Sequence, residues 1–91
     1  MPKFVIERNM PELGNLSEAE FKDAARHSSS VLQAMGAEVQ WIESYVTRDK
    51  MFCVYLSPSE ALIREHAERS GFPAHTIRKV ERIINPMTAE A

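Results

Sequence analysis

The chain has 91 residues, of which 44% are hydrophobic and 26% are charged, and its formal net charge is −2. This length accommodates one hydrophobic core and excludes a second domain. The charge argues against non-specific nucleic-acid binding, which needs a basic surface. No apolar run approaches the length of a membrane span, so we expect no association with a membrane.

The cysteine content and the termini indicate where the protein resides. Cys53 is the single cysteine of the sequence, which makes an internal disulfide impossible. A reducing cytoplasm is the default compartment for such a chain. The opening MPKFVIERNM lacks the apolar core of a signal peptide. We therefore expect a cytoplasmic protein with one domain over residues 1–86 and a frayed tail over residues 87–91.

The first predicted elements are a strand and a helix. Residues 3–8 alternate in polarity, which is typical of a strand. After a loop, Ser17 and Glu20 match the capping box that begins many helices. Apolar residues at helical spacing then predict a helix that ends at Gly36, because glycine readily adopts the left-handed conformation found after helices.

Two strands joined by a tight turn follow, over residues 38–47 and 51–57. Because one face of a sheet must be buried, the register should keep the two alternating sets of side chains apart. The predicted cross-strand pairs are Thr47 with Met51, Tyr45 with Cys53, and Glu43 with Tyr55.

The last two predicted elements are a helix and a strand. Ser57 and Pro58 begin the helix, and Gly71 ends it. Residues 76–85 form the closing strand. The order β-α-β-β-α-β predicts the ferredoxin-like fold, an α+β architecture whose four-stranded antiparallel sheet carries both helices on one face.

Two helices leave the other face of this sheet uncovered. The residues expected to face the helices are Phe4, Ile6, Ile42, Val46, Phe52, Val54, Leu56, Val80 and Ile84. The residues expected on the uncovered face are Val5, Glu7, Trp41, Glu43, Tyr45, Met51, Cys53, Tyr55, Glu81 and Ile83. Apolar, aromatic surfaces of this kind usually mark interfaces or ligand grooves. The uncovered face therefore predicts either a homodimer or a small-ligand site.

Several side chains are candidates for binding. The candidate ligand contacts are Glu7, Glu43, Tyr45, Cys53 and Tyr55. The candidate metal ligands are His66 and Glu7, because imidazole and carboxylate together suit nickel and other divalent transition metals. No ligand spacing links the histidines, so a buried His66 bonded to a backbone carbonyl is the alternative. RNA binding is disfavoured because acidic side chains on the sheet would repel phosphate.

Two segments, SYVTRDKMFCVY and REHAERSGFPA, resemble a family of small domains of unknown function related to a nickel-binding protein of actinobacteria. The similarity extends to the opening MPKFVIER and the closing VERIINP. It implies a ferredoxin-like fold, a homodimer, and nickel as a bound metal. The resemblance places histidines at the end of the first strand, where this chain has Glu7-Arg8-Asn9, and leaves His66 as the imidazole at a matching position.

Three functions remain open from the sequence. The first is a non-enzymatic homodimeric domain that binds a metal ion or a small ligand on the uncovered sheet face. The second is a dimeric α+β barrel enzyme acting on a small organic molecule, with Glu7 or His66 as general acid or base. The third is a purely structural dimer. The resemblance favours the first.

Overall fold

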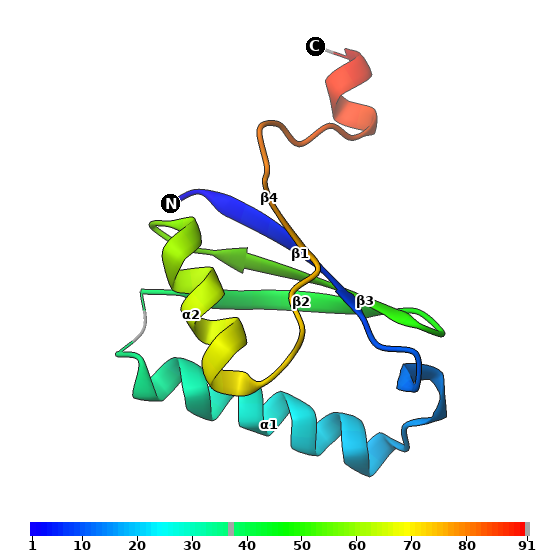
Figure 1. Cartoon of the computed structure of the whole chain (residues 1–91). Coiled ribbons are helices and arrows are strands. Elements are labelled where there is room, and N and C mark those ends of the chain that lie inside the picture. Colours follow the sequence, from blue (N-terminus) through cyan, green and yellow to red (C-terminus); the bar gives the residue numbers. More distant parts are fainter. Residues whose placement is uncertain (37, 91) are drawn as a thin grey trace.

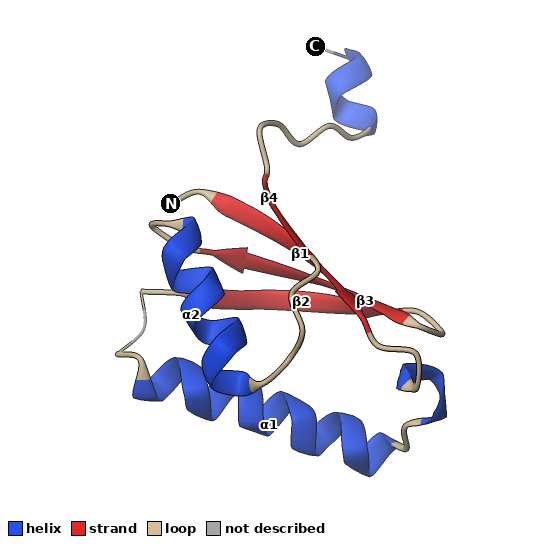
Figure 2. Cartoon of the chain, viewed as in Figure 1, coloured by secondary structure: helices blue, strands red, loops and turns tan. Residues whose placement is uncertain are grey.

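The computed structural model describes residues 1–36 and 38–90. Its helices and strands are β1 (Lys3–Asn9), α1 (Glu18–Ala34), β2 (Gln40–Val46), β3 (Lys50–Leu56), α2 (Glu60–Ser70) and β4 (Thr76–Lys79). Neighbouring strands are antiparallel in the order β2-β3-β1-β4, and both helices lie on one side of the sheet (Figure 1; Figure 2). The predicted ferredoxin-like α+β fold is confirmed.

Local sequence determines the ends of the helices. Ser17 Oγ accepts a hydrogen bond from the Glu20 N–H at 3.1 Å, and Glu20 Oε1 accepts one from the Ser17 N–H at 3.0 Å. The predicted capping box of α1 is therefore confirmed. Gly36 and Gly71 adopt φ angles of 71° and 79° after the two helices, as the sequence predicted.

The start of α2 differs from the prediction. Ser59, and not Ser57, caps this helix, by accepting a hydrogen bond from the Leu62 N–H. Ser57 is buried: its N–H donates to the Pro2 carbonyl at 3.0 Å and its hydroxyl donates to the Ser59 carbonyl at 2.8 Å. Ser57 therefore closes the turn between β3 and α2. Across residues 1–36 and 38–90, neither helix combines the length and apolar character that a membrane crossing requires.

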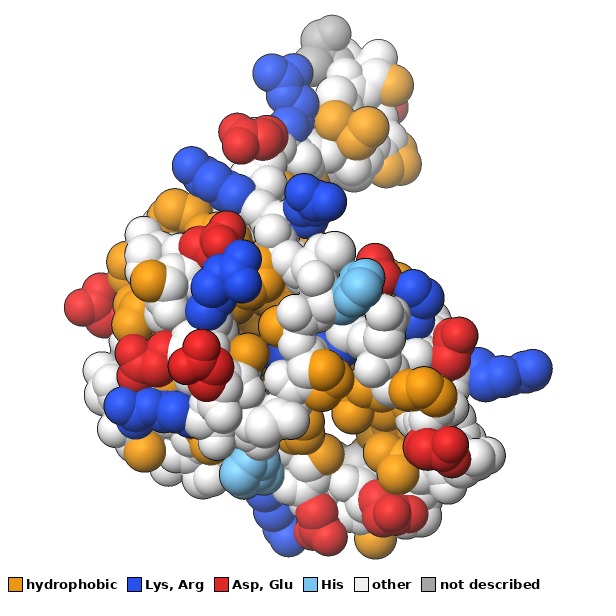
Figure 3. Space-filling view, viewed as in Figure 1, with side chains coloured by type: hydrophobic (Ala, Val, Ile, Leu, Met, Phe, Trp, Pro, Cys, Tyr) orange, Lys and Arg blue, Asp and Glu red, His pale blue; other side chains and the backbone are white. Residues whose placement is uncertain are grey.

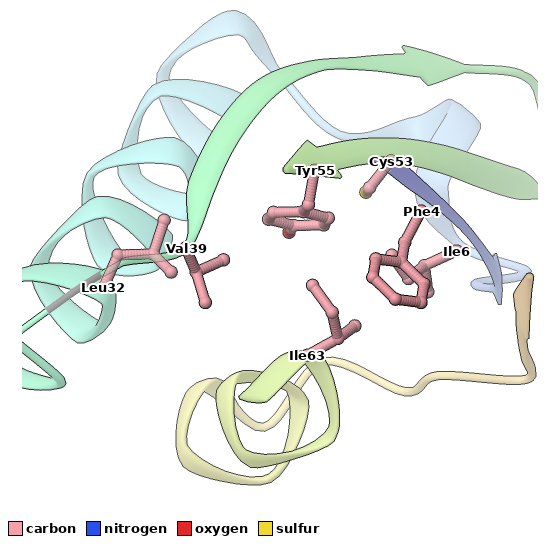
Figure 4. Close-up of a cluster of buried hydrophobic side chains, with 7 residues drawn as sticks. All are labelled: Phe4, Ile6, Leu32, Val39, Cys53, Tyr55 and Ile63. Carbon is pink, nitrogen blue, oxygen red and sulfur yellow. The ribbon is translucent and has the colours of Figure 1, made fainter. Parts of the chain in front are cut away.

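The pairing of β1 with β3 decides which face of the sheet the helices cover. Phe4 lies opposite Tyr55, and Ile6 lies opposite Cys53; directly opposed side chains share a face. These four residues are buried in one cluster with Ile63 of α2, and Figure 4 shows them converging. The prediction that Cys53 and Tyr55 lie on the uncovered face is wrong.

The register of β2 against β3 is shifted by one residue from the prediction. Ser44, and not Tyr45, lies opposite Cys53. The loop is one residue shorter than predicted because Thr47 pairs with Lys50: the Thr47 N–H donates to the Lys50 carbonyl at 2.9 Å, and the Lys50 N–H donates to Thr47 Oγ1 at 3.1 Å. The threonine side chain thus closes the hairpin.

A β-bulge near the start of β2 shifts its register against β3 by one more residue. Trp41 lies opposite Tyr55, while Glu43 lies opposite Val54, with the irregularity between them. Trp41 Nε1 donates to Ser44 Oγ at 2.9 Å on the covered face. Both faces of β3 are apolar, so alternation alone did not determine its phase. Four residues predicted on the open face lie on the covered face: Trp41, Met51, Cys53 and Tyr55. Three residues predicted on the covered face lie on the open face: Phe52, Val54 and Leu56.

The last strand is shorter than predicted. β4 pairs with β1 and ends at Lys79, where the Val80 N–H donates to the Lys3 carbonyl at 2.8 Å. Residues 81–90, here called the C-terminal arm, leave the sheet and project from the body of the domain (Figure 1). The arm contains a short 3-10 turn at Pro86–Glu90. The predicted strand beyond residue 79 is therefore wrong.

Every described residue of the C-terminal arm is exposed. Its apolar side chains Ile83, Ile84 and Met87 are among the large hydrophobic residues that remain accessible to solvent. Ile84 does not lie beneath the helices, because the chain has left the sheet before this position. Ala91 of the predicted tail lies outside the described residues.

Candidate functional site

A cavity of about 200 Å³ lies between the first half of α1 and the covered face of the sheet. In Figure 3 hydrophobic side chains surround a hollow in the surface above α1. The large apolar residues of its wall include Leu13, Phe21, Trp41, Met51 and Phe72. The polar residues of its wall are Arg8, Ser28, Ser44, Cys53 and Tyr55. The cavity is thus an apolar space with a few polar groups on one side.

Arg8 is the charged residue of this wall, and strand geometry places it there. In β1 every second side chain faces the helices, so Arg8 follows Phe4 and Ile6 onto the covered face. Its partner across the sheet is Met51 of β3. The Arg8 side chain is almost fully buried, with 1% of the residue exposed. Arginine is rarely buried to this extent without an anionic partner.

The hydrogen bonds of the Arg8 guanidinium end on uncharged groups. Nε donates to Cys53 Sγ at 3.4 Å, and Nη2 donates to Tyr55 Oη at 3.3 Å. Nη1 donates to the backbone carbonyl of Pro73 at 2.9 Å. The Phe72 ring lies beside the guanidinium, with its centroid 5.9 Å from Cζ. Dipoles and an aromatic face therefore solvate this buried charge.

Tyr55 lines the cavity beside Arg8, and His66 lies behind Tyr55. Burial, chiefly, raises the pKa of the Tyr55 phenol above its ordinary value of 10.0, so the hydroxyl keeps its proton at neutral pH. The Tyr55 and His66 rings are 5.5 Å apart between centroids. His66 Nε2 lies 3.2 Å from Ser28 Oγ and 3.4 Å from the Ser28 carbonyl oxygen.

His66 is fully buried on α2, at 0% exposure. Burial is the main cause that lowers the pKa of His66 below its ordinary value of 6.5, and the nearby positive charge of Arg8 lowers it further. The imidazole is therefore neutral at pH 7. Within the described part of the chain, its Nδ1 has no hydrogen-bond partner.

Three of the predicted ligand contacts lie on the open face of the sheet. Glu7 Oε2 accepts a hydrogen bond from Lys50 Nζ at 2.8 Å, and this bond lowers the pKa of the Glu7 carboxyl. Tyr45 Oη donates to Glu43 Oε2, which raises the pKa of the Tyr45 phenol. Glu7 is thus paired with Lys50, and Tyr45 with Glu43, on the open face, whereas Cys53 and Tyr55 face the helices.

The two predicted metal ligands do not meet within one chain. Glu7 alternates with the buried residues Ile6 and Arg8 and so points to the open face, whereas His66 packs beneath α2 on the covered face. Among residues 1–36 and 38–90, no three His, Cys, Asp or Glu side chains gather closely enough to hold a metal ion.

Sequence reasoning missed Arg8 as a site residue. The signal was present, because Arg8 has the same parity as Phe4 and Ile6 in a strand whose apolar side must face the core. An arginine at such a position predicts a buried charge. Cys53 and Tyr55 were predicted as ligand contacts, and the structure brings both of them to Arg8.

Comparisons with known proteins place the chain in a family. The family model described as nickel responsive protein SCO4226-like matches residues 4–80, and the chain belongs to this family, as its resemblance predicted. A crystal structure of SCO4226 from Streptomyces coelicolor A3(2) matches with a TM-score of 0.75 over 90% of this chain and 99% of that chain. The two are 15% identical, so this likeness shows the fold. No curated protein matches the chain.

Proposed function

We propose, for this member of the SCO4226-like family, that the chain is a non-enzymatic binding domain whose cavity beneath α1 holds a small organic ligand. The observation that carries this proposal is the apolar cavity of about 200 Å³ with the buried Arg8 guanidinium in its wall. Small-molecule sites combine apolar walls with a few oriented polar groups. A cavity of about 150 Å³ accommodates benzene, so this one suits a molecule only slightly larger.

Binding accounts for the arrangement better than catalysis. The candidate acid–base residues Glu7 and His66 do not line the cavity. Glu7 is paired with Lys50 on the opposite face, and His66 lies behind Ser28 and Tyr55. A general acid or base must come within hydrogen-bond distance of its substrate. The polar groups that do line the cavity are suited to orienting a ligand.

The family description associates these proteins with nickel, and His66 with Glu7 would be the donors here. Their separation by the sheet does not fit a nickel site within one protomer, and in the part of the chain that is described neither residue belongs to a group of three His, Cys, Asp or Glu side chains that could hold a metal ion. We therefore expect nickel to bind to chelator-stripped wild type no more tightly than to His66→Ala. Calorimetric titration of both proteins measures this difference.

A second copy of the chain is the partner that we propose for the open face. This face carries the partly exposed Phe52, Val54 and Leu56, and the C-terminal arm adds exposed apolar side chains of its own. Two apolar surfaces on one chain suit a twofold dimer, in which each copy offers both. A domain of this length also gains stability from additional burial.

Sedimentation equilibrium of the full chain and of a variant lacking residues 81–90 tests the homodimer. We expect the full chain to associate and the shortened chain to associate more weakly, because its exposed apolar side chains are fewer. A full chain that remains monomeric at all protein concentrations would contradict the dimer but leave the cavity proposal intact.

The cavity proposal is tested by filling the cavity. Ala24 lines it, whereas Ala34 is exposed at the end of α1. A panel of organic molecules of up to about ten non-hydrogen atoms is screened by thermal unfolding, where a ligand at 100 times its Kd stabilises by about 2.7 kcal/mol. We expect stabilisation of wild type and of Ala34→Leu, and its loss in Ala24→Leu.

Two outcomes would contradict the cavity as the binding site. One is that no member of the panel stabilises the wild-type protein. The other is that a stabilising compound acts equally on Ala24→Leu and on the matched control Ala34→Leu, because a ligand bound elsewhere does not respond to the volume of residue 24.

A further inference from the structure

We propose that the ligand of this cavity is a compact carboxylate with an apolar body, whose carboxylate oxygens accept hydrogen bonds from Arg8 and Tyr55. This inference rests on the proposed function and specifies the chemical class that the cavity selects. It follows from the uncompensated charge of Arg8, the unused hydrogen-bond donors beside it, and the apolar wall around them.

Among the residues that the structure describes, the charge of Arg8 has no acidic counterpart. Its hydrogen bonds end on a thiol, a phenol and backbone carbonyls. The ion pairs in the described residues are Lys50 with Glu7, Arg64 with Glu60, and Arg69 with Glu65. No Asp or Glu is among the residues that line the cavity. A buried cation with neutral partners is costly, and an anion beside it would offset that cost.

Two donors are available for such an anion. Nη2 of Arg8 has Tyr55 Oη as its partner among the described residues, so one of its two N–H groups is unused. Tyr55 Oη accepts this bond and keeps its own hydrogen to donate. A carboxylate has two oxygens on one carbon and accepts neighbouring bonds of this kind, and its bond to a guanidinium is charge-assisted.

The rest of the wall determines the body of the ligand. Leu13, Phe21 and Met51 present apolar surface, and the volume of about 200 Å³ limits the body to roughly the size of a single ring. Inorganic phosphate would meet the same donors but would leave this apolar surface without a partner. The combination of one anionic group with a small apolar body therefore favours a carboxylic acid such as benzoate.

Isothermal titration calorimetry at pH 7 tests the assignment with three probes: benzoate, benzyl alcohol and inorganic phosphate. Benzyl alcohol has a similar apolar body without the charge. We expect wild type to bind benzoate about tenfold or more tightly than benzyl alcohol, because a charge-assisted hydrogen bond replaces a neutral one. We expect phosphate to bind more weakly than benzoate.

Substitutions then assign the preference to Arg8. Arg8→Met keeps an unbranched apolar side chain but removes the guanidinium, so the preference for benzoate should disappear while benzyl alcohol still binds. Arg78→Met is the matched control, because Arg78 is exposed on the open face opposite Val5, and it should retain the preference. If Arg8→Met does not fold, Tyr55→Phe keeps the charge and removes one donor, and should weaken benzoate more than benzyl alcohol.

Different results contradict the carboxylate assignment and the proposal that the cavity binds a ligand. Equal affinity of wild type for benzoate and benzyl alcohol would overturn the carboxylate while the cavity still binds ligands. A preference for benzoate that survives in Arg8→Met, or that is undiminished in Tyr55→Phe where that variant replaces it, would overturn the assignment to these donors. Binding of none of the probes to wild type, together with no stabilising compound in the thermal screen, would overturn both.

Discussion

The two faces of the sheet are built from the same four strands but bury their side chains differently. On the covered face Ile6, Cys53 and Tyr55 are each at most 2% exposed, and they surround the charged Arg8. On the open face Val54 and Phe52 stay partly exposed. The covered face is a completed core that contains a charge, whereas the open face is apolar surface without a cover in the single chain.

This difference has a consequence for where function can lie. Polar groups on the open face pair with one another, as Glu7 does with Lys50, and water can reach them. On the covered face, Arg8 and His66 are held away from water, so their electrostatic interactions are stronger and any missing partner costs more. A buried charge beside a cavity therefore points to ligand binding more directly than a partly exposed ion pair does.

The largest expected contrast between the faces comes from apolar truncation. Ile6→Ala on the covered face should lower the free energy of unfolding by about 2–5 kcal/mol, because it leaves a cavity in packed surroundings. Val54→Ala on the open face should cost about 1 kcal/mol or less in dilute protein. Urea unfolding measures both, and repeating it at higher protein concentration shows whether Val54 becomes covered. Equal losses in dilute protein would contradict the contrast.

The next contrast concerns one hydroxyl group on each face. Tyr55→Phe removes the acceptor of the Arg8 Nη2 bond and should lower the free energy of unfolding by about 1–3 kcal/mol. Tyr45→Phe removes the exposed hydroxyl that donates to Glu43 and should leave the unfolding midpoint nearly unchanged. Chemical denaturation of the two variants measures this difference. An equal loss of unfolding free energy in both variants would contradict a stabilising role for the hydrogen bond between Tyr55 and Arg8.

His66 should make the covered face sensitive to mild acid. Its pKa is lower in the folded protein than its ordinary value of 6.5, so below about pH 7 the unfolded chain binds more protons than the folded one. Stability should therefore fall as the pH drops from 7 towards the folded-state pKa, by at most about 1.4 kcal/mol per pH unit.

Unfolding measured between pH 7 and 5 tests this dependence. His66→Gln should flatten it, whereas His75→Gln, at an exposed histidine, should not. If the wild-type slope persists in His66→Gln, His66 is not the group whose protonation causes it.

The smallest effect is expected from the ion pair of the open face. Lys50 lowers the pKa of Glu7 below its ordinary value of 4.5, so this pair contributes stability above pH 4.5 that is lost as the pH falls through the lowered pKa. Glu7→Gln should shift the melting temperature slightly at low salt and not at high salt, because salt screens exposed charges. A change in the pH 7 to 5 profile of this variant would contradict the separation of the two faces.

Several predictions that depended on near neighbours in the chain were correct, although the Ser57 cap and the length of the hairpin loop were not. The capping box of Ser17 and Glu20 and the left-handed Gly36 and Gly71 all depend on backbone within a few residues. The order of helices and strands follows from local periodicity, and it restricts the topology to the ferredoxin-like fold. The likeness of the fold to that of SCO4226 agrees with this derivation.

Predictions about the faces of β3, and of Trp41 at the start of β2, were wrong for a different reason, whereas Glu43, Tyr45 and Val46 lie on their predicted faces. In β3 both alternating sets of side chains are apolar, so burial of one set or the other was equally consistent with the sequence. A turn closed by Thr47 and a bulge next to Trp41 then shifted β2 by one residue. The shift places Cys53 on the face of Ser44 instead of the face of Tyr45, because side chains alternate along both strands with a period of two.

The sequence by itself determined the order of the elements, the capped start of α1, the glycines that end both helices and the burial of one side of β1, because these depend on hydrogen bonds and periodicity within a few residues. Only the tertiary structure decided that Cys53 and Tyr55 join Arg8 beside a cavity and that Glu7 and His66 stay apart. The contacts that make this choice connect β1 to residues 45 and 47 positions further along the chain. Such contacts form only when the strands pair, and the pairing is selected by the packing of the whole core.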